Sequence, residues 1–143
     1  MTDSLKISLA QLNPVVGDIE GNVAKIRAAR LAAADSGADL VIGTELCITG
    51  YPPEDLILKN AFVRAAMAAV EALAAETADG GPGLIVGAPW FDGEDSRYNA
   101  AVVLDDGKVQ TVRCKWDLPN YGVFDEKRIF KAGELPGPVN FRG

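Results

Sequence analysis

Glu45 and Lys115 are the two side chains of this sequence best placed to carry out chemistry. Glu45 comes just after the apolar run at residues 40–43, which is typical of a strand buried on both faces. Open α/β sheets place their sites beyond the C-terminal ends of such strands, where a carboxylate can act as a general base. Lys115 ends another apolar run, and its ammonium can stabilise an oxyanion. The pair indicates proton transfer at a tetrahedral intermediate, with a solvated loop carboxylate and a strand-end lysine as the structural alternatives.

The loop after Lys115 carries further candidate site residues. Residues 118–122 read LPNYG, a rigid turn that would hold the lysine in place. Glu126 can hydrogen-bond either the lysine or the general base. Tyr51 and Tyr121 each lie six positions past one member of the pair, so they can flank a small polar substrate or simply cover the loops.

A nucleophile is harder to find in this chain. There is no histidine, which excludes Ser-His-Asp and Cys-His mechanisms and most zinc sites. Cys114 adjoins Lys115 in a predicted strand, so the two side chains should point to opposite faces. Cys47 lies too close in sequence to Glu45 for both to approach one carbonyl easily. We expect both cysteines to be core residues, the nucleophile to lie elsewhere, and no metal site in this chain.

Composition indicates an ordinary globular domain. The 143 residues suffice for one domain with its own core, and 48% apolar and 24% charged residues are close to the average. Fourteen basic against twenty acidic residues give a net charge of -6, which disfavours binding to nucleic acid or anionic lipid. The N-terminus lacks the features of a signal peptide, and no apolar run is long enough to span a membrane. We therefore expect a cytoplasmic protein with reduced thiols.

Apolar runs and turn residues predict the order of the elements. Strands are expected at residues 6–12, 40–43, 84–89, 99–104 and 108–114, and residues 139–142 resemble the start of another. Asp105-Asp106-Gly107 predicts a tight hairpin between the last two full strands. One helix follows Gly17-Asp18 and ends near residues 36–37, and a second, which Asn60 may cap, reaches Ala78. The residues expected to face the core are Val23, Ile26, Ala29 and Ala33 in the first helix, and Phe62, Ala66, Ala69 and Leu73 in the second.

These elements predict an α/β fold. Two strand-helix units followed by a hairpin indicate a mixed sheet with helices on one face. A chain that ends on a strand leaves edge groups unpaired and an apolar face uncovered, so we expect it to be a fragment.

Five segments together resemble the nitrilase, or carbon-nitrogen hydrolase, superfamily. They are KISLAQLNPVVGDIEGN at residues 6–22, GTELCITGYPPEDLILK at 43–59, VGAPW at 86–90, YNAAVVL at 98–104 and KWDLPNYGVFDEKRIF at 115–130. Within that superfamily, the forms at residues 51–56 and 118–130 are similar to those of the glutamine-dependent NAD synthetases. Trp116-Asp117 and Ile129 depart from the wider pattern, which concerns the packing of the loop and not the proposed chemistry.

The resemblance implies an αββα sandwich of which residues 1–143 are roughly the N-terminal half of a glutaminase domain. It implies that Glu45 is the proton acceptor, Lys115 the glutaminase lysine, Tyr121 a glutamine-binding residue and Tyr51 a weaker candidate for that role. The cysteine nucleophile is then expected beyond Gly143, so that the isolated chain is inactive.

For the full enzyme the resemblance implies glutamine as substrate and an ATP-binding synthetase domain that uses magnesium. It implies ammonia delivery to nicotinate adenine dinucleotide to form NAD, and a homo-oligomer. Two alternatives are a stand-alone amidase or carbamoylase of the same superfamily and a non-catalytic module that associates through its exposed sheet.

Overall fold

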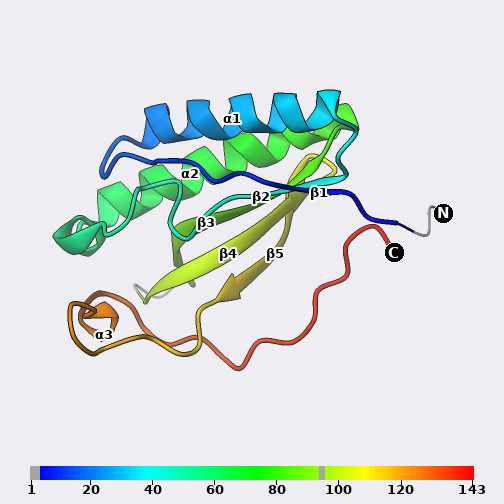
Figure 1. The fold of residues 1–143 in the computed structure, drawn as a ribbon. Helices are drawn as coiled ribbons and strands as arrows, with labels where there is room; N and C mark the ends of the chain where they lie inside the picture. The colour runs from blue at the N-terminus through cyan, green and yellow to red at the C-terminus, as the bar shows by residue number, and fades with distance from the viewer. Residues whose placement is uncertain (1–3, 94–95) are drawn as a thin grey trace.

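A five-stranded mixed sheet forms the centre of the structure, a computed structural model that describes residues 4–93 and 96–143 (Figure 1). The strands lie in chain order: β1 (Ile7–Leu9), β2 (Leu40–Ile42), β3 (Gly83–Phe91), β4 (Arg97–Asp105) and β5 (Lys108–Cys114). β1, β2 and β3 run parallel to one another, whereas β4 runs antiparallel to both β3 and β5. The predicted α/β fold with a mixed sheet is confirmed.

Two long helices cover one face of this sheet, α1 (Ile19–Asp35) and α2 (Asn60–Glu76) (Figure 1). Asp18 caps α1, because its Oδ1 accepts a hydrogen bond of 2.9 Å from the backbone nitrogen of Gly21. Shorter helical turns follow at η1 (Glu54–Leu58), η2 (Thr77–Asp79) and α3 (Glu126–Ile129). No helix among the described residues is long and apolar enough to cross a membrane.

The core faces of the helices were predicted correctly for α1 and only partly for α2. Val23, Ile26 and Ala33 of α1 are buried, and Ala29 packs against them. In α2, Val63 and Val70 are fully buried in place of the expected Phe62 and Ala69, which are half-buried. Nearly every residue of this helix is apolar or alanine, so the pattern does not fix which face is inward.

Asn60 does not cap α2, which corrects a second expectation for this helix. Lys59 occupies the cap position without a side-chain hydrogen bond, and Asn60 is the first helical residue. Its Oδ1 instead accepts a hydrogen bond of 2.7 Å from Nη2 of Arg97 at the start of β4. The helix also ends at Glu76, before Ala78.

The hairpin between β4 and β5 forms as predicted. Asp105 pairs with Lys108, which leaves Asp106 and Gly107 as a two-residue turn. Both have positive φ, at 51° and 75°, as a type I′ turn requires.

The face of the sheet opposite α1 and α2 is only partly covered. Its side chains include Leu9, which is 77% exposed, and Ile42 and Ile85 on the neighbouring strands. The chain from Lys115 onward runs along this side (Figure 1). A four-layer sandwich needs two sheets and two helix layers, whereas residues 4–93 and 96–143 form one sheet and one helix layer.

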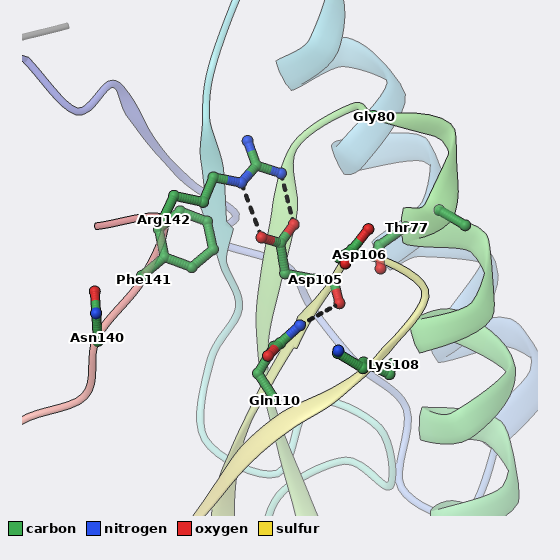
Figure 2. A pocket seen from close by; sticks show the side chains of 10 residues that line it. Thr77, Gly80, Asp105, Asp106, Lys108, Gln110, Asn140, Phe141 and Arg142 are labelled. Carbon is green, nitrogen blue, oxygen red and sulfur yellow. Dashed lines mark hydrogen bonds and ion pairs between the residues drawn. The ribbon is translucent and has the colours of Figure 1, made fainter. Parts of the chain in front are cut away.

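The expected strand at residues 139–142 does not form: the segment pairs with none of the five strands. It is held instead by Arg142, whose Nη2 and Nε lie 2.5 and 2.9 Å from the carboxylate of Asp105 (Figure 2). The ring of Phe141 lies against Gly83, where a Cβ would come within 2.8 Å of it. Side-chain contacts rather than a backbone ladder therefore fix this segment.

Candidate functional site

The turn that carries Glu45 begins where β2 ends. The backbone nitrogen of Gly43 still bonds the carbonyl of Ile85 at 2.8 Å, and the chain then leaves the sheet. Leu46 has a positive φ of 49° and is fully buried, so the turn reverses tightly and its apolar side chain anchors it. Glu45 thus emerges beyond the C-terminal end of a buried strand, as predicted.

Gly87 of β3 makes room for this turn. A Cβ at Gly87 would lie 2.3 Å from the nitrogen of Leu46 and 2.7 Å from the carbonyl oxygen of Thr44, both of them backbone atoms. Because only glycine lacks that carbon, the backbone on either side of Glu45 can lie directly against the sheet.

Lys115 follows the last residue of β5 and is held through its backbone on two sides. Its nitrogen bonds the carbonyl of Asn99 at 2.7 Å, and its carbonyl accepts a bond of 2.8 Å from Gly133. Cys114 packs against the core beneath the helices, whereas Lys115 faces the other side of the sheet. The predicted opposite orientation of these two side chains is confirmed.

The ammonium of Lys115 joins the two acidic residues that were predicted to lie near it. Its Nζ lies 2.8 Å from Oε1 of Glu45 and 2.9 Å from Oε1 of Glu126. The three side chains differ in exposure, at 31% for Lys115, 46% for Glu45 and 6% for Glu126. Glu45 therefore meets, across 70 positions of sequence, the lysine and the loop that follows it.

The two carboxylates keep the lysine charged. Partial burial alone would lower the pKa of Lys115. The hydrogen bonds that its ammonium donates to Glu45 and Glu126, together with the negative charges of these two residues, outweigh burial, so the pKa is raised. A protonated ammonium at neutral pH is the form that can stabilise an oxyanion.

Glu126 is the buried member of the group. It starts α3, and its backbone nitrogen bonds the carbonyl of Pro119 at 3.3 Å, which closes the loop between them. Its Oε1 is bound by Lys115, while its Oε2 is buried without a hydrogen-bond partner in the described part of the chain.

One small apolar cluster supports both the Glu45 turn and the loop after Lys115. It is separate from the main core beneath the helices. Its buried members are Leu46, Ile57, Val63, Phe91, Leu118 and Phe130. Leu46 follows Glu45 directly and Leu118 lies three residues past Lys115, so the same packing fixes both loops.

Tyr51 and Tyr121 are the two aromatic residues that were predicted to flank the substrate, and they line two different hollows. Burial raises the pKa of the Tyr51 hydroxyl, and the charges of Glu126 and Glu45 raise it further, which places the tyrosine near both carboxylates. Tyr121 is 71% exposed and borders a hollow of about 470 Å³ together with Lys115. Its ring packs edge-on against Phe124, with centroids 5.6 Å apart.

Neither cysteine is poised as a nucleophile. Cys47 is almost fully buried, its Sγ faces the carbonyl of Gly87 at 3.8 Å, and burial raises the pKa of its thiol. The pKa of Cys114 is likewise raised by partial burial. A thiol attacks as the thiolate, so these environments disfavour the reactive form.

The site opens onto the partly covered face of the sheet. A groove of about 630 Å³ has Glu45, Asn99 and Lys115 among its lining residues, and its remaining wall is largely apolar. A second hollow, of about 510 Å³, lies between the β4–β5 turn, η2 and residues 140–142 (Figure 2). It contains none of the predicted site residues.

Two residues of the site were not predicted from the sequence. Asn99 is buried, and its Nδ2 donates a hydrogen bond of 2.6 Å to Oε1 of Glu45. A polar side chain inside an apolar strand was a signal for it. Gly87 offered a weaker signal, as a glycine within a predicted strand.

Among residues 4–93 and 96–143, no three histidine, cysteine or acidic side chains cluster as metal ligands would.

Comparison with known proteins identifies relatives with the same architecture. A glutamine-dependent NAD(+) synthetase of Rhodobacter capsulatus is 49% identical over 97% of this chain, which covers 25% of that protein. A crystal structure of a glutamine-dependent NAD(+) synthetase from Cytophaga hutchinsonii superposes with a TM-score of 0.85 and 30% identity, over 96% of this chain and 23% of the other. The chain thus spans about a quarter of these relatives.

A smaller enzyme also shares the fold. An amidase from Nesterenkonia sp. AN1, with acrylamide added at its active-site cysteine, superposes with a TM-score of 0.81 and 28% identity. That superposition covers 98% of this chain and 54% of the amidase. The profile of the carbon-nitrogen hydrolases matches residues 6–141, nearly the whole sequence, and the chain therefore belongs to the carbon-nitrogen hydrolase family.

Proposed function

We propose that this chain is part of a glutaminase domain that supplies ammonia for NAD synthesis. The observation that carries the proposal is the contact of one ammonium, that of Lys115, with the carboxylates of Glu45 and Glu126 at 2.8 and 2.9 Å. Amide hydrolysis needs a proton carrier and a cation beside the oxyanion, and Glu45 and Lys115 supply both. The similarity to glutamine-dependent NAD(+) synthetases supports glutamine as the amide.

In the proposed reaction a thiolate attacks the side-chain amide of glutamine. Glu45 takes the thiol proton and gives it to the leaving ammonia, which leaves a thioester on the enzyme. Glu45 then removes a proton from a water molecule that hydrolyses the thioester. Lys115 stabilises the oxyanion of each tetrahedral intermediate, and buried Glu126 holds the lysine in place.

We place the thiol outside residues 1–143. Cys47 is buried against Gly87, and Cys114 lies on the helix side of the sheet. An active-site cysteine in the Nesterenkonia amidase, about half of which this chain covers, supports a nucleophile from another segment. Residues 1–143 alone are accordingly proposed to hydrolyse no glutamine.

ATP and magnesium belong to the same proposal but not to these residues. We assign ATP-dependent conversion of nicotinate adenine dinucleotide to NAD to the remainder of a longer, homo-oligomeric polypeptide in the cytoplasm.

The test is ammonia release and NAD formation by the intact gene product. Wild type should form NAD from glutamine and ATP, whereas Glu45→Gln and Lys115→Met should lose glutamine-driven synthesis. Both variants should keep synthesis from free ammonia, which shows that the rest of the protein is folded. Glutamine-driven synthesis at the wild-type rate in both variants would refute the site.

A stand-alone amidase is the second candidate, because the Nesterenkonia amidase shares the fold at a TM-score of 0.81. The same experiment separates the two functions. An amidase releases ammonia from simple amides and forms no NAD when ATP and nicotinate adenine dinucleotide are supplied.

A further inference from the structure

The side chain of Asn99 binds the same carboxylate oxygen as the lysine. Its Nδ2 lies 2.6 Å from Oε1 of Glu45, and Nζ of Lys115 lies 2.8 Å from that atom. No donor among the described residues contacts Oε2 of Glu45. The two oxygens of this carboxylate are therefore in different environments.

Asn99 is itself held rigidly. It is 4% exposed and lies within β4, paired with Pro89 on β3. Its carbonyl accepts a bond of 2.7 Å from the backbone nitrogen of Lys115. One residue thus fixes the carboxylate through its side chain and the start of the lysine loop through its backbone.

The orientation of the amide follows from the chemistry of its partner. An ionised carboxylate can only accept hydrogen bonds, so the nitrogen of the amide, not its oxygen, must face Glu45. The amide therefore donates to Glu45 and holds its carboxylate in one orientation.

We propose that Asn99 is a positioning residue that occupies Oε1 of Glu45 and thereby leaves Oε2 as the oxygen that takes up and returns the proton. Because two donors already share the electron density of Oε1, the next proton goes to Oε2. This inference rests on the proposed function and adds to it the identity of the reacting atom. It also explains why a polar side chain is tolerated inside a buried strand.

The test uses the intact gene product with Asn99→Leu, which keeps the size of the side chain and removes the donor. Loss of a hydrogen bond to a charged group should lower kcat for glutamine hydrolysis about tenfold to a hundredfold, with KM little changed. Asn99→Asp, which sets a second carboxylate against Glu45 and removes the donor, should lower kcat at least as much, again with KM little changed. Asn140→Leu, an exposed change at the far hollow, should match wild type.

Two variants separate failure of this inference from failure of the proposed function. If Glu45→Gln abolishes glutamine hydrolysis while Asn99→Leu keeps the wild-type kcat, the role of Asn99 is refuted and the glutaminase stands. If Glu45→Gln remains active, the proposed function itself fails. Should Asn99→Leu not fold, as judged by ammonia-driven synthesis and circular dichroism, Asn99→Ser carries the test, and the same loss of kcat with little change in KM is expected.

Discussion

The backbone nitrogen of Leu46 lies 2.3 Å from the position that a Cβ on Gly87 would occupy. The two residues belong to different elements, a loop after β2 and the interior of β3, and they are in contact because Gly87 has no side chain. Glu45 sits next to Leu46, so the absence of one carbon atom on the sheet determines where the proposed base lies.

Gly87→Ala should therefore displace the turn and reduce both stability and activity. The clashing atoms belong to backbone and cannot rotate away, so we expect a loss of roughly 1–3 kcal/mol in the free energy of unfolding. Glutamine hydrolysis should fall more than tenfold, because a shift of about 1 Å at a catalytic group can cost a factor of a hundred. Thermal unfolding and ammonia release measure the two effects.

Gly137→Ala is the matched control. A Cβ at Gly137 meets no atom within 4 Å, and its φ is not in the left-handed region. The variant should unfold at the wild-type temperature, and equal behaviour of both alanine variants would contradict the steric account.

Lys115 and Glu126 should be energetically coupled. Glu126 is almost fully buried and Lys115 is its ion-pair partner, so Lys115→Met leaves an uncompensated charge that costs about 3–5 kcal/mol. In a Glu126→Gln background the same change should cost much less. A double-mutant cycle by chemical denaturation measures the difference, and additive costs would show that the two residues act independently.

The ion pairs of Lys115 should also make stability sensitive to alkaline pH. Its pKa in the folded protein is raised above the ordinary 10.5, so the stabilisation is complete below 10.5 and is lost as pH rises through the folded value. Stability measured over that range should fall less in Lys115→Met than in wild type. Lys127→Met, which changes an exposed lysine of the same loop, should fall as steeply as wild type.

Local patterns were enough to predict most of the fold. Glu45 and Lys115 each follow an apolar run, so their place at strand ends follows from short-range sequence. The Asp106-Gly107 turn was equally local, because its positive φ angles demand those residue types. The candidate site residues could be picked out from local sequence because they lie in loops next to well-marked strands.

Features that depend on long-range pairing could not be predicted in this way. Asn99 meets Glu45 across 54 positions of sequence, and the contact depends on how β2, β3 and β4 align. Residues 139–142 have strand-like composition, yet they pair with no strand in the described part of the chain, and the Arg142 ion pair holds them instead. Residue composition gives a segment's preference for strand or helix, whereas its contacts with distant segments determine the structure that it adopts.

The ion pair between Arg30 and Asp79 should control stability in acid. The Arg30 guanidinium, whose Nη2 lies 2.6 Å away, lowers the pKa of Asp79 from 3.8 to about 2. The contribution of this ion pair to the free energy of unfolding is therefore present above pH 3.8 and is lost as pH falls towards 2. Asp79 is exposed, so salt should weaken the effect. Acid unfolding of Asp79→Asn should lack this component, whereas Glu71→Gln, at an exposed position of α2, should retain it.

Tyr121 should act on substrate binding more than on chemistry. It is exposed beside Lys115 and bonds neither that lysine nor Glu45, so its ring can contact a bound substrate without touching the proposed proton carrier. Tyr121→Ala should raise KM for glutamine several-fold while kcat changes little, as expected when binding is lost equally from ground and transition states. Val123→Ala, an exposed change in the same loop, should leave KM unchanged. A fall in kcat without a rise in KM would instead place Tyr121 in the support of Lys115.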